Sequence, residues 1–214
     1  MRRQRHRGLT PLGERDNLRH VRHMTDMNRI NIYGLAGITV LAGAPRGSDM
    51  FTKLIKHINP EPANPEPVFL DFDKIEVATA SYLRESVIAF RDFVRAKRSM
   101  LYPVIANANE AVREELTLLA TSSGNVIMSC SLAPDGEVSD SSLIGALDPK
   151  QQLAFDLVNQ RGETDASELM RDFGEGLRHA TGWNNRLASL AAIGVVIEVS
   201  QGRSKKYRPL FAEA

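Results

Sequence analysis

Short, almost continuous apolar runs alternate along this chain with longer stretches of helical periodicity. The runs Val68–Phe72, Tyr102–Ala106 and Val126–Ser131 are too short for helices and suit strands that are buried on both faces. Between the first two, apolar residues recur at steps of four, three and four, which is the spacing of one helix face. These residues are Leu83, Val87, Phe90 and Val94. The charged residues among them are expected to face solvent: Arg84, Glu85, Arg91, Asp92 and Arg95. Because parallel strands need crossover helices, this part of the chain is predicted to be an α/β domain.

Turn and cap residues predict the other elements of this domain. Short strands are expected at Asn31–Tyr33 and Ile38–Ala42, with a turn at Gly34 between them. Ser48 or Asp49 is expected to cap the next helix. The apolar stripe of that helix is Phe51, Leu54, Ile55 and Ile58.

Proline, cap and turn residues likewise predict the elements of the second half of the domain. Four prolines in residues 59–67 exclude a helix and predict a stiff linker. Ile75–Ala78 is expected to be extended, and Asn109 to cap a helix that runs to about residue 120. A closing hairpin is expected from residues 126–131 and Glu137–Leu147, around the turn Pro134–Gly136.

Residues 149–211 predict a smaller domain of three helices and a β-hairpin. Asp148 and Pro149 suit a helix start, and Arg161–Gly162 suits its end. The apolar side of this helix is expected to be Leu153, Ala154, Leu157 and Val158. Thr164 or Asp165 is expected to cap the second helix, which carries Leu169 and Met170 before a break at Gly174–Gly176. Thr181 is expected to cap the third helix, Gly194 to end it, and the strands Val195–Val199 and Lys205–Pro209 to follow.

The net charge of +1 is the sum of three unlike parts. Residues 1–27 are basic, residues 28–148 are acidic, and residues 176–210 carry six basic groups against Glu198. We interpret residues 1–27 as a disordered basic arm or as sequence upstream of a true start at Met24 or Met27. A nucleic-acid-binding arm stays open, whereas His6, His20 and His23 lack a compact metal-ligand spacing. The acidic middle domain is expected to face proteins rather than DNA.

The segment Val68–Phe72 followed by Ile75–Glu85 resembles the STAS-like domain family over about residues 28–148. That resemblance implies a mixed sheet with helices, and a helix start at which related anti-sigma-factor antagonists are phosphorylated on serine. Here Ala80 stands at the usual acceptor position, between Thr79 and Ser81. Thr79 and Ser81 are therefore expected either to cap the helix or to serve as a phosphorylation or partner-contact site. Asp71 and Asp73 are expected to have a turn role rather than a metal or acid–base role.

The C-terminal part resembles the winged helix-turn-helix of bacterial transcriptional regulators, on the run from Asn185 to Val196 and on Gly202–Tyr207. The start of the third helix would then lie in the major groove, where asparagine can pair with adenine and arginine with guanine. The expected DNA-binding residues are Thr181, Asn184, Asn185, Arg186, Arg203, Lys205 and Lys206. Three alternatives stay open: Arg186 pairs with a surface acid, the lysines are only solvated, and Trp183 and Tyr207 are packing residues.

The sequence therefore predicts a bacterial DNA-binding transcriptional regulator whose STAS-like domain senses a signal or binds a partner protein. The alternative is a protein-interaction switch that binds an anti-sigma-type kinase or ATPase and not DNA. No Walker loop, Gly-x-Ser-x-Gly, Gly-x-Gly-x-x-Gly or metal-ligand spacing occurs, so we expect no enzyme activity, no cofactor and no metal. One cysteine, Cys130, favours a cytoplasmic protein without an intrachain disulfide. The longest apolar stretch is too short for a membrane span, and a homodimer stays open.

Overall fold

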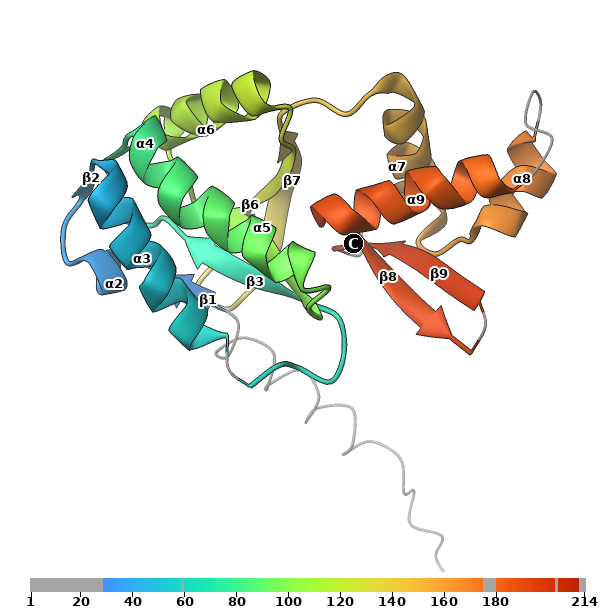
Figure 1. Ribbon diagram of the computed structural model, residues 1–214, viewed down its shortest axis with the longest axis horizontal. Helices are drawn as coiled ribbons and strands as arrows, with labels where there is room; N and C mark the ends of the chain where they lie inside the picture. The colour runs from blue at the N-terminus through green and yellow to red at the C-terminus, as the bar shows by residue number, and fades with distance from the viewer. Residues whose placement is uncertain (1–28, 59, 175–179, 203, 212–214) are drawn as a thin grey trace, which may run out of the picture.

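The computed structural model describes residues 29–58, 60–174, 180–202 and 204–211, and has an α/β fold built on a mixed sheet (Figure 1). The five strands lie in the order β1 (Arg29–Asn31), β3 (Glu66–Asp71), β5 (Leu101–Ala106), β6 (Ile127–Leu132) and β7 (Val138–Ile144). The first four are parallel and β7 is antiparallel to β6. A separate parallel ribbon pairs β2 (Val40–Leu41) with β4 (Val77–Ala78).

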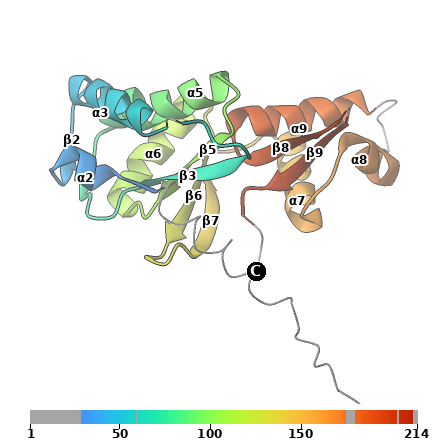
Figure 2. The same cartoon turned by 90° about the horizontal axis from the view of Figure 1, so that it is seen from below.

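Helices cover one face of the sheet. They are α3 (Ala44–His57), α6 (Glu110–Ser123) and one continuous helical run made of α4 (Ala80–Leu83), the π-helical turn η1 (Arg84–Ile88) and α5 (Ala89–Ala96). Figure 2 shows α3, α5 and α6 on the same side of the strands. A first apolar core fills the space between them, with Leu54, Leu70 and Phe90 fully buried. The predicted α/β architecture and its buried strands are thus confirmed.

The C-terminal part (residues 149–211) consists of α7 (Pro149–Arg161), α8 (Ala166–Phe173), α9 (Thr181–Ile193) and a hairpin of β8 (Val196–Gln201) with β9 (Ser204–Pro209). It packs against the sheet side chains that point away from the first core. Tyr102, Val104 and Met128 share a second apolar core with Leu157 and Trp183. The ring of Phe211 also stacks on Phe69, with centroids 6.0 Å apart. The C-terminal part and the α/β part (residues 29–148) therefore share one of the two cores.

Several local predictions are confirmed by cap geometry. The Asn109 side chain accepts a hydrogen bond from the Val112 amide and begins α6. Asp148 and Asp165 form capping boxes at the starts of α7 and α8. Gly194, at φ 87°, ends α9 in the left-handed conformation that a residue without a Cβ adopts freely.

Other local predictions are wrong. Residues 32–36 form the short helix α2 (Ile32–Ala36) instead of continuing a strand, because the Asn31 side chain accepts from the Gly34 amide at 2.7 Å. The helix expected after Ser48 or Asp49 already begins at Ala44, with Pro45 in its first turn. Thr181 is the first residue of α9 and caps nothing, since Ala180 holds the cap position without a side-chain bond.

Three side chains face another way than predicted. Arg95, expected in solvent, donates to Ser99 O, Leu101 O and Ala191 O. Arg91 is buried rather than solvated, and its guanidinium donates to Val126 O at 3.0 Å and to Asn125 Oδ1 at 2.6 Å. Leu153, expected on the inner side of α7, is 48% exposed. The linker prediction also ends too late, because Glu66 and Pro67 belong to β3 and lie opposite Leu101 and Tyr102.

Candidate functional site

The first candidate site is the exposed side of α9. Trp183, Leu187 and Leu190 turn into the second core and hold the helix against α7 and α8. The opposite side is solvent-exposed at Thr181, Asn184, Asn185, Ala188 and Ala192. The helix therefore presents uncharged polar groups on its first two turns and small alanines on its last two.

Trp183 and Arg186 form a pair on this helix. The Trp183 ring is 1% exposed, so its interpretation as a core residue is confirmed. The Arg186 guanidinium lies over that ring, 4.7 Å from its centroid, in a cation–π contact. Arg186 thus stacks on Trp183, whereas the alternative had it pairing with a surface acid.

The two expected lysines of the β8–β9 hairpin have different surroundings. Lys206 Nζ lies 2.9 Å from Asp165 Oδ2 and 2.7 Å from Glu168 Oε1, at the start of α8. Hydrogen bonds to these carboxylates raise the pKa of Lys206 to about 12, and the bond from Lys206 lowers the pKa of Glu168. Lys206 therefore joins β9 to α8 and is not simply solvated.

Lys205 remains half exposed and pairs with Glu198 at 2.8 Å across the hairpin. The neighbouring Tyr207 is buried, as its packing interpretation requires. Its backbone exchanges two hydrogen bonds with Thr164, of 2.9 and 2.8 Å, which tie the hairpin to the loop before α8. Arg203 lies outside the described residues.

The second candidate site is the helix start at Thr79 and Ser81. Thr79 Oγ1 accepts from the amides of Tyr82 and Gly43, both at 3.4 Å, and lies 3.2 Å from Ser81 Oγ. The predicted capping role of Thr79 is confirmed. The Ala80 amide, one step further, donates to Glu115 Oε2 at 2.9 Å. The first amide of this helix is thus already paired with a carboxylate from α6.

Asp71 lies at the carboxyl end of β3 and is fully buried. It accepts from Arg29 at 2.7–2.8 Å, from Asn107 Nδ2 at 2.8 Å and from the Asp73 amide at 3.1 Å. The bond from Asp73 closes the turn after the strand, which confirms the predicted turn role. Within the described ranges, no three His, Cys, Asp or Glu side chains gather as a metal site would require.

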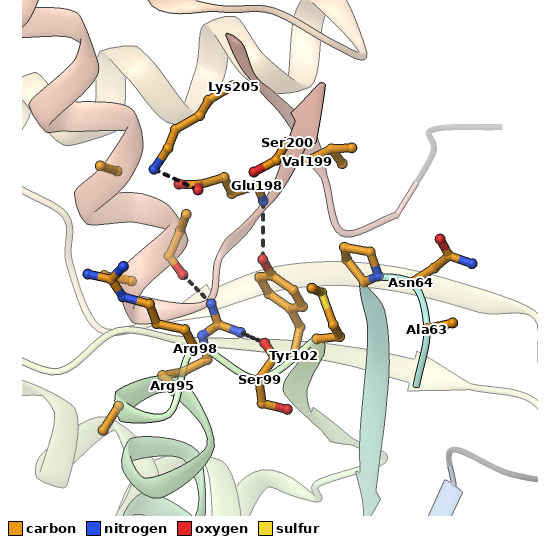
Figure 3. Close-up of a pocket in the computed structure, with 16 residues that line it drawn as sticks. Ala63, Asn64, Arg95, Arg98, Ser99, Tyr102, Glu198, Val199, Ser200 and Lys205 are labelled. Carbon is orange, nitrogen blue, oxygen red and sulfur yellow. Dashed lines mark hydrogen bonds and ion pairs between the residues drawn. The ribbon is translucent and has the colours of Figure 1, made fainter. Parts of the chain in front are cut away.

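A third group of residues lines a cleft of about 460 Å³ between the two parts, and of its charged residues the sequence predicted a functional role only for Lys205 (Figure 3). Arg95, Arg98 and Tyr102 line it from the α/β part, and Glu198 and Lys205 line it from the hairpin. The only sequence signal was the adjacent cations Lys97 and Arg98 just after the helical run.

No protein-family model, no curated protein and no solved structure matches the chain. In the part of the chain that the structure describes, no helix is both long and apolar enough to cross a membrane.

Proposed function

We propose that the protein is a bacterial DNA-binding transcriptional regulator in which residues 149–211 form a winged helix-turn-helix and residues 28–148 a STAS-like domain. The order of elements in the C-terminal part supports this assignment. Helix α7 is followed by the Thr164–Tyr207 bridge, then by α8, α9 and the β8–β9 hairpin. In this arrangement α9 is the recognition helix and the hairpin is the wing.

The exposed polar start of α9 is the observation that carries the proposal. The Asn184 and Asn185 side chains are exposed and form no hydrogen bond with any residue that the structure describes. An asparagine side chain can form two hydrogen bonds with adenine in the major groove. The backbone amides at the start of α9 can hold a phosphate at the groove edge.

The cations around this helix have unequal roles in the proposal. Lys205 is exposed enough to reach a phosphate. Lys206 contributes indirectly, because its ion pairs fix the hairpin against α8. Arg186 would first have to leave the Trp183 ring before it could reach a base. Asn184 and Asn185 are therefore the better candidates for base recognition.

The test uses the full chain, because the shared second core argues against truncation at residue 148. DNA fragments are selected from a random pool, and affinity is measured by filter binding over a range of salt concentrations. We expect a negative slope of log affinity against log salt. Asn184→Ala and Asn185→Ala should each weaken binding to the selected site by about 1–3 kcal/mol, with little change for random DNA.

Gln160→Ala, an exposed amide on α7, is the matched control and should leave affinity unchanged. The proposal fails if the wild-type chain selects no site, or if both asparagine variants bind that site as tightly as the control does.

A second function, as a protein-interaction switch, is supported by an exposed apolar strip beside Thr79. Val40 and Val77 are register partners on the β2–β4 ribbon, and both are more than 40% exposed, as is Ile38. An anti-sigma-type kinase or ATPase could cover this strip and the helix start. This function is favoured over the first if the wild-type chain binds no DNA and a partner protein binds the wild type but not Val40→Asp.

A further inference from the structure

The cleft between the α/β part and the C-terminal part is rich in cations. Figure 3 shows Arg95 and Arg98 on one side and Lys205 on the other, with Glu198 between them. Glu198 is already engaged, since it pairs with Lys205 and accepts from the Tyr207 hydroxyl at 3.3 Å. Three cations therefore line the cleft against one carboxylate.

Arg95 holds the two walls of the cleft together. Its guanidinium donates to Ser99 O and Leu101 O within the α/β part, and to Ala191 O on α9 at 2.9 Å. It also lies 4.0 Å from the centre of the Tyr102 ring. The Tyr102 hydroxyl in turn accepts from the Glu198 amide at 3.1 Å. These contacts fix Arg98 and the hairpin on opposite sides of the same space.

Arg98 is the cation with the greatest freedom to bind a ligand. Its side chain is exposed and makes no ion pair or hydrogen bond with any residue that the structure describes. Its backbone has φ 52°, a left-handed conformation that is uncommon for a residue other than glycine. Here it ends the helical run, since the Arg98 amide donates to Arg95 O and the Ser99 amide donates to Val94 O. The conformation sets Arg98 at the rim of the cleft.

The cleft is continuous with the exposed side of α9. Ala188 and Ala192 line it, and they follow Thr181 and Asn184 on the same helix face at steps of three and four. Their side chains are too small to obstruct a ligand that lies along the helix. A DNA strand whose phosphate backbone passes the start of α9 and continues along the helix would therefore reach Arg98 and Lys205 next.

We propose that Arg98, together with Lys205 across the cleft, binds phosphates of the DNA backbone beside α9. This inference rests on the proposed function and adds a contact from the α/β part, whose acidic composition predicted that it would avoid DNA. An arginine guanidinium suits this role, because its planar set of N–H groups can donate two parallel hydrogen bonds to a phosphate. Such a contact increases the affinity for DNA of any sequence and does not recognise bases.

The test measures the salt dependence of DNA binding by the full chain with Arg98→Asn, because asparagine tolerates the left-handed backbone at this position. The slope of log affinity against log salt should become shallower by about 0.9, the value for one lost phosphate contact. The preference for the selected site over random DNA should not change. Arg98→Lys should keep most of the slope, and Arg98→Asn with Lys205→Gln should lose about twice as much.

Arg84→Gln is the matched control, an exposed arginine on the same helical run that pairs with Glu85. Its slope should equal that of the wild type, and circular dichroism spectra should show all variants folded. If the wild type binds no DNA, the proposed function itself fails. If the wild type binds DNA and folded Arg98→Asn has an unchanged slope, only the inference about Arg98 is overturned.

Discussion

Asn107 is expected to be a main contributor to the stability of the α/β part. It follows β5 with φ 54°, and its side chain links two neighbouring strands. The amide nitrogen donates to Asp71 Oδ1 at 2.8 Å and to Leu132 O at 3.0 Å. The amide oxygen accepts from the Leu132 amide at 2.8 Å. Removing the side chain leaves three polar groups without this partner.

The size of the effect follows from these bonds. Two neutral hydrogen bonds contribute about 1 kcal/mol each, and the bond to the Asp71 carboxylate about 2 kcal/mol. At this half-buried position, water can replace some of the lost hydrogen bonds. Asn107→Gly should therefore lower the free energy of unfolding by about 3 kcal/mol. Asn107→Ala should cost about 1 kcal/mol more, because alanine is disfavoured in the left-handed conformation that glycine adopts freely.

Equilibrium urea unfolding of both variants and the wild type measures this difference. Circular dichroism follows the whole chain, and fluorescence follows Trp183, the one tryptophan of the sequence. The two probes should give the same midpoint, because the C-terminal part shares a core with the sheet. The reasoning is refuted if Asn107→Gly costs less than about 1 kcal/mol, or if alanine is tolerated as well as glycine.

Three further predictions concern packing, pH and thiol chemistry. A Cβ at Gly47 would lie 2.6 Å from Tyr82 O, so Gly47→Ala should destabilise by about 1–2 kcal/mol in the same urea assay. Gly34→Ala, whose Cβ would meet nothing closer than 3.5 Å, should be neutral or stabilising. Because Lys206 lowers the pKa of Glu168 below its ordinary value of 4.5, that stabilisation is complete above this pH and is lost as pH falls through the lowered pKa. The urea midpoint should therefore be lower below pH 4.5 than at neutral pH, and this decrease should be smaller in Lys206→Met. Burial, with the nearby Asp71 charge, raises the pKa of Cys130 to about 12, so a maleimide at neutral pH should label it only in denaturant.

Features fixed by neighbouring residues in the chain could be predicted from the sequence. Asn109 and Asp148 cap helices by bonding to amides two or three residues ahead, and Gly194 ends a helix through its own backbone freedom. The inward residues of the helical run were also predicted, because their spacing sets the buried face. These features depend on no contact between distant segments.

Features that depend on distant partners could not be predicted. Arg91 and Arg84 look alike on the helical pattern, yet only Arg91 meets the carbonyl of Val126, 35 residues further along the chain. The ion pairs of Lys206 and the cleft cations depend likewise on how α8 and α9 pack. The polar outer face of α9 was predicted locally, whereas its extension to Arg98 required the docked C-terminal part.

The two candidate sites are connected by a single structural element. Thr79 caps the first turn of the run from Ala80 to Ala96, and Arg95 lies one residue before its end. At 1.5 Å per residue this run is about 25 Å long, and every segment of it except the η1 turn has α-helical hydrogen bonding. Arg95 donates to Ala191 O in the last turns of α9, so the run fixes the helix that is proposed to read DNA. The α/β part is therefore a structural support of α9, the proposed recognition helix. If the chain binds DNA as proposed, a ligand at the Thr79 end would change that binding through α9 by displacing this run or by breaking the bond from Arg95 to Ala191 O.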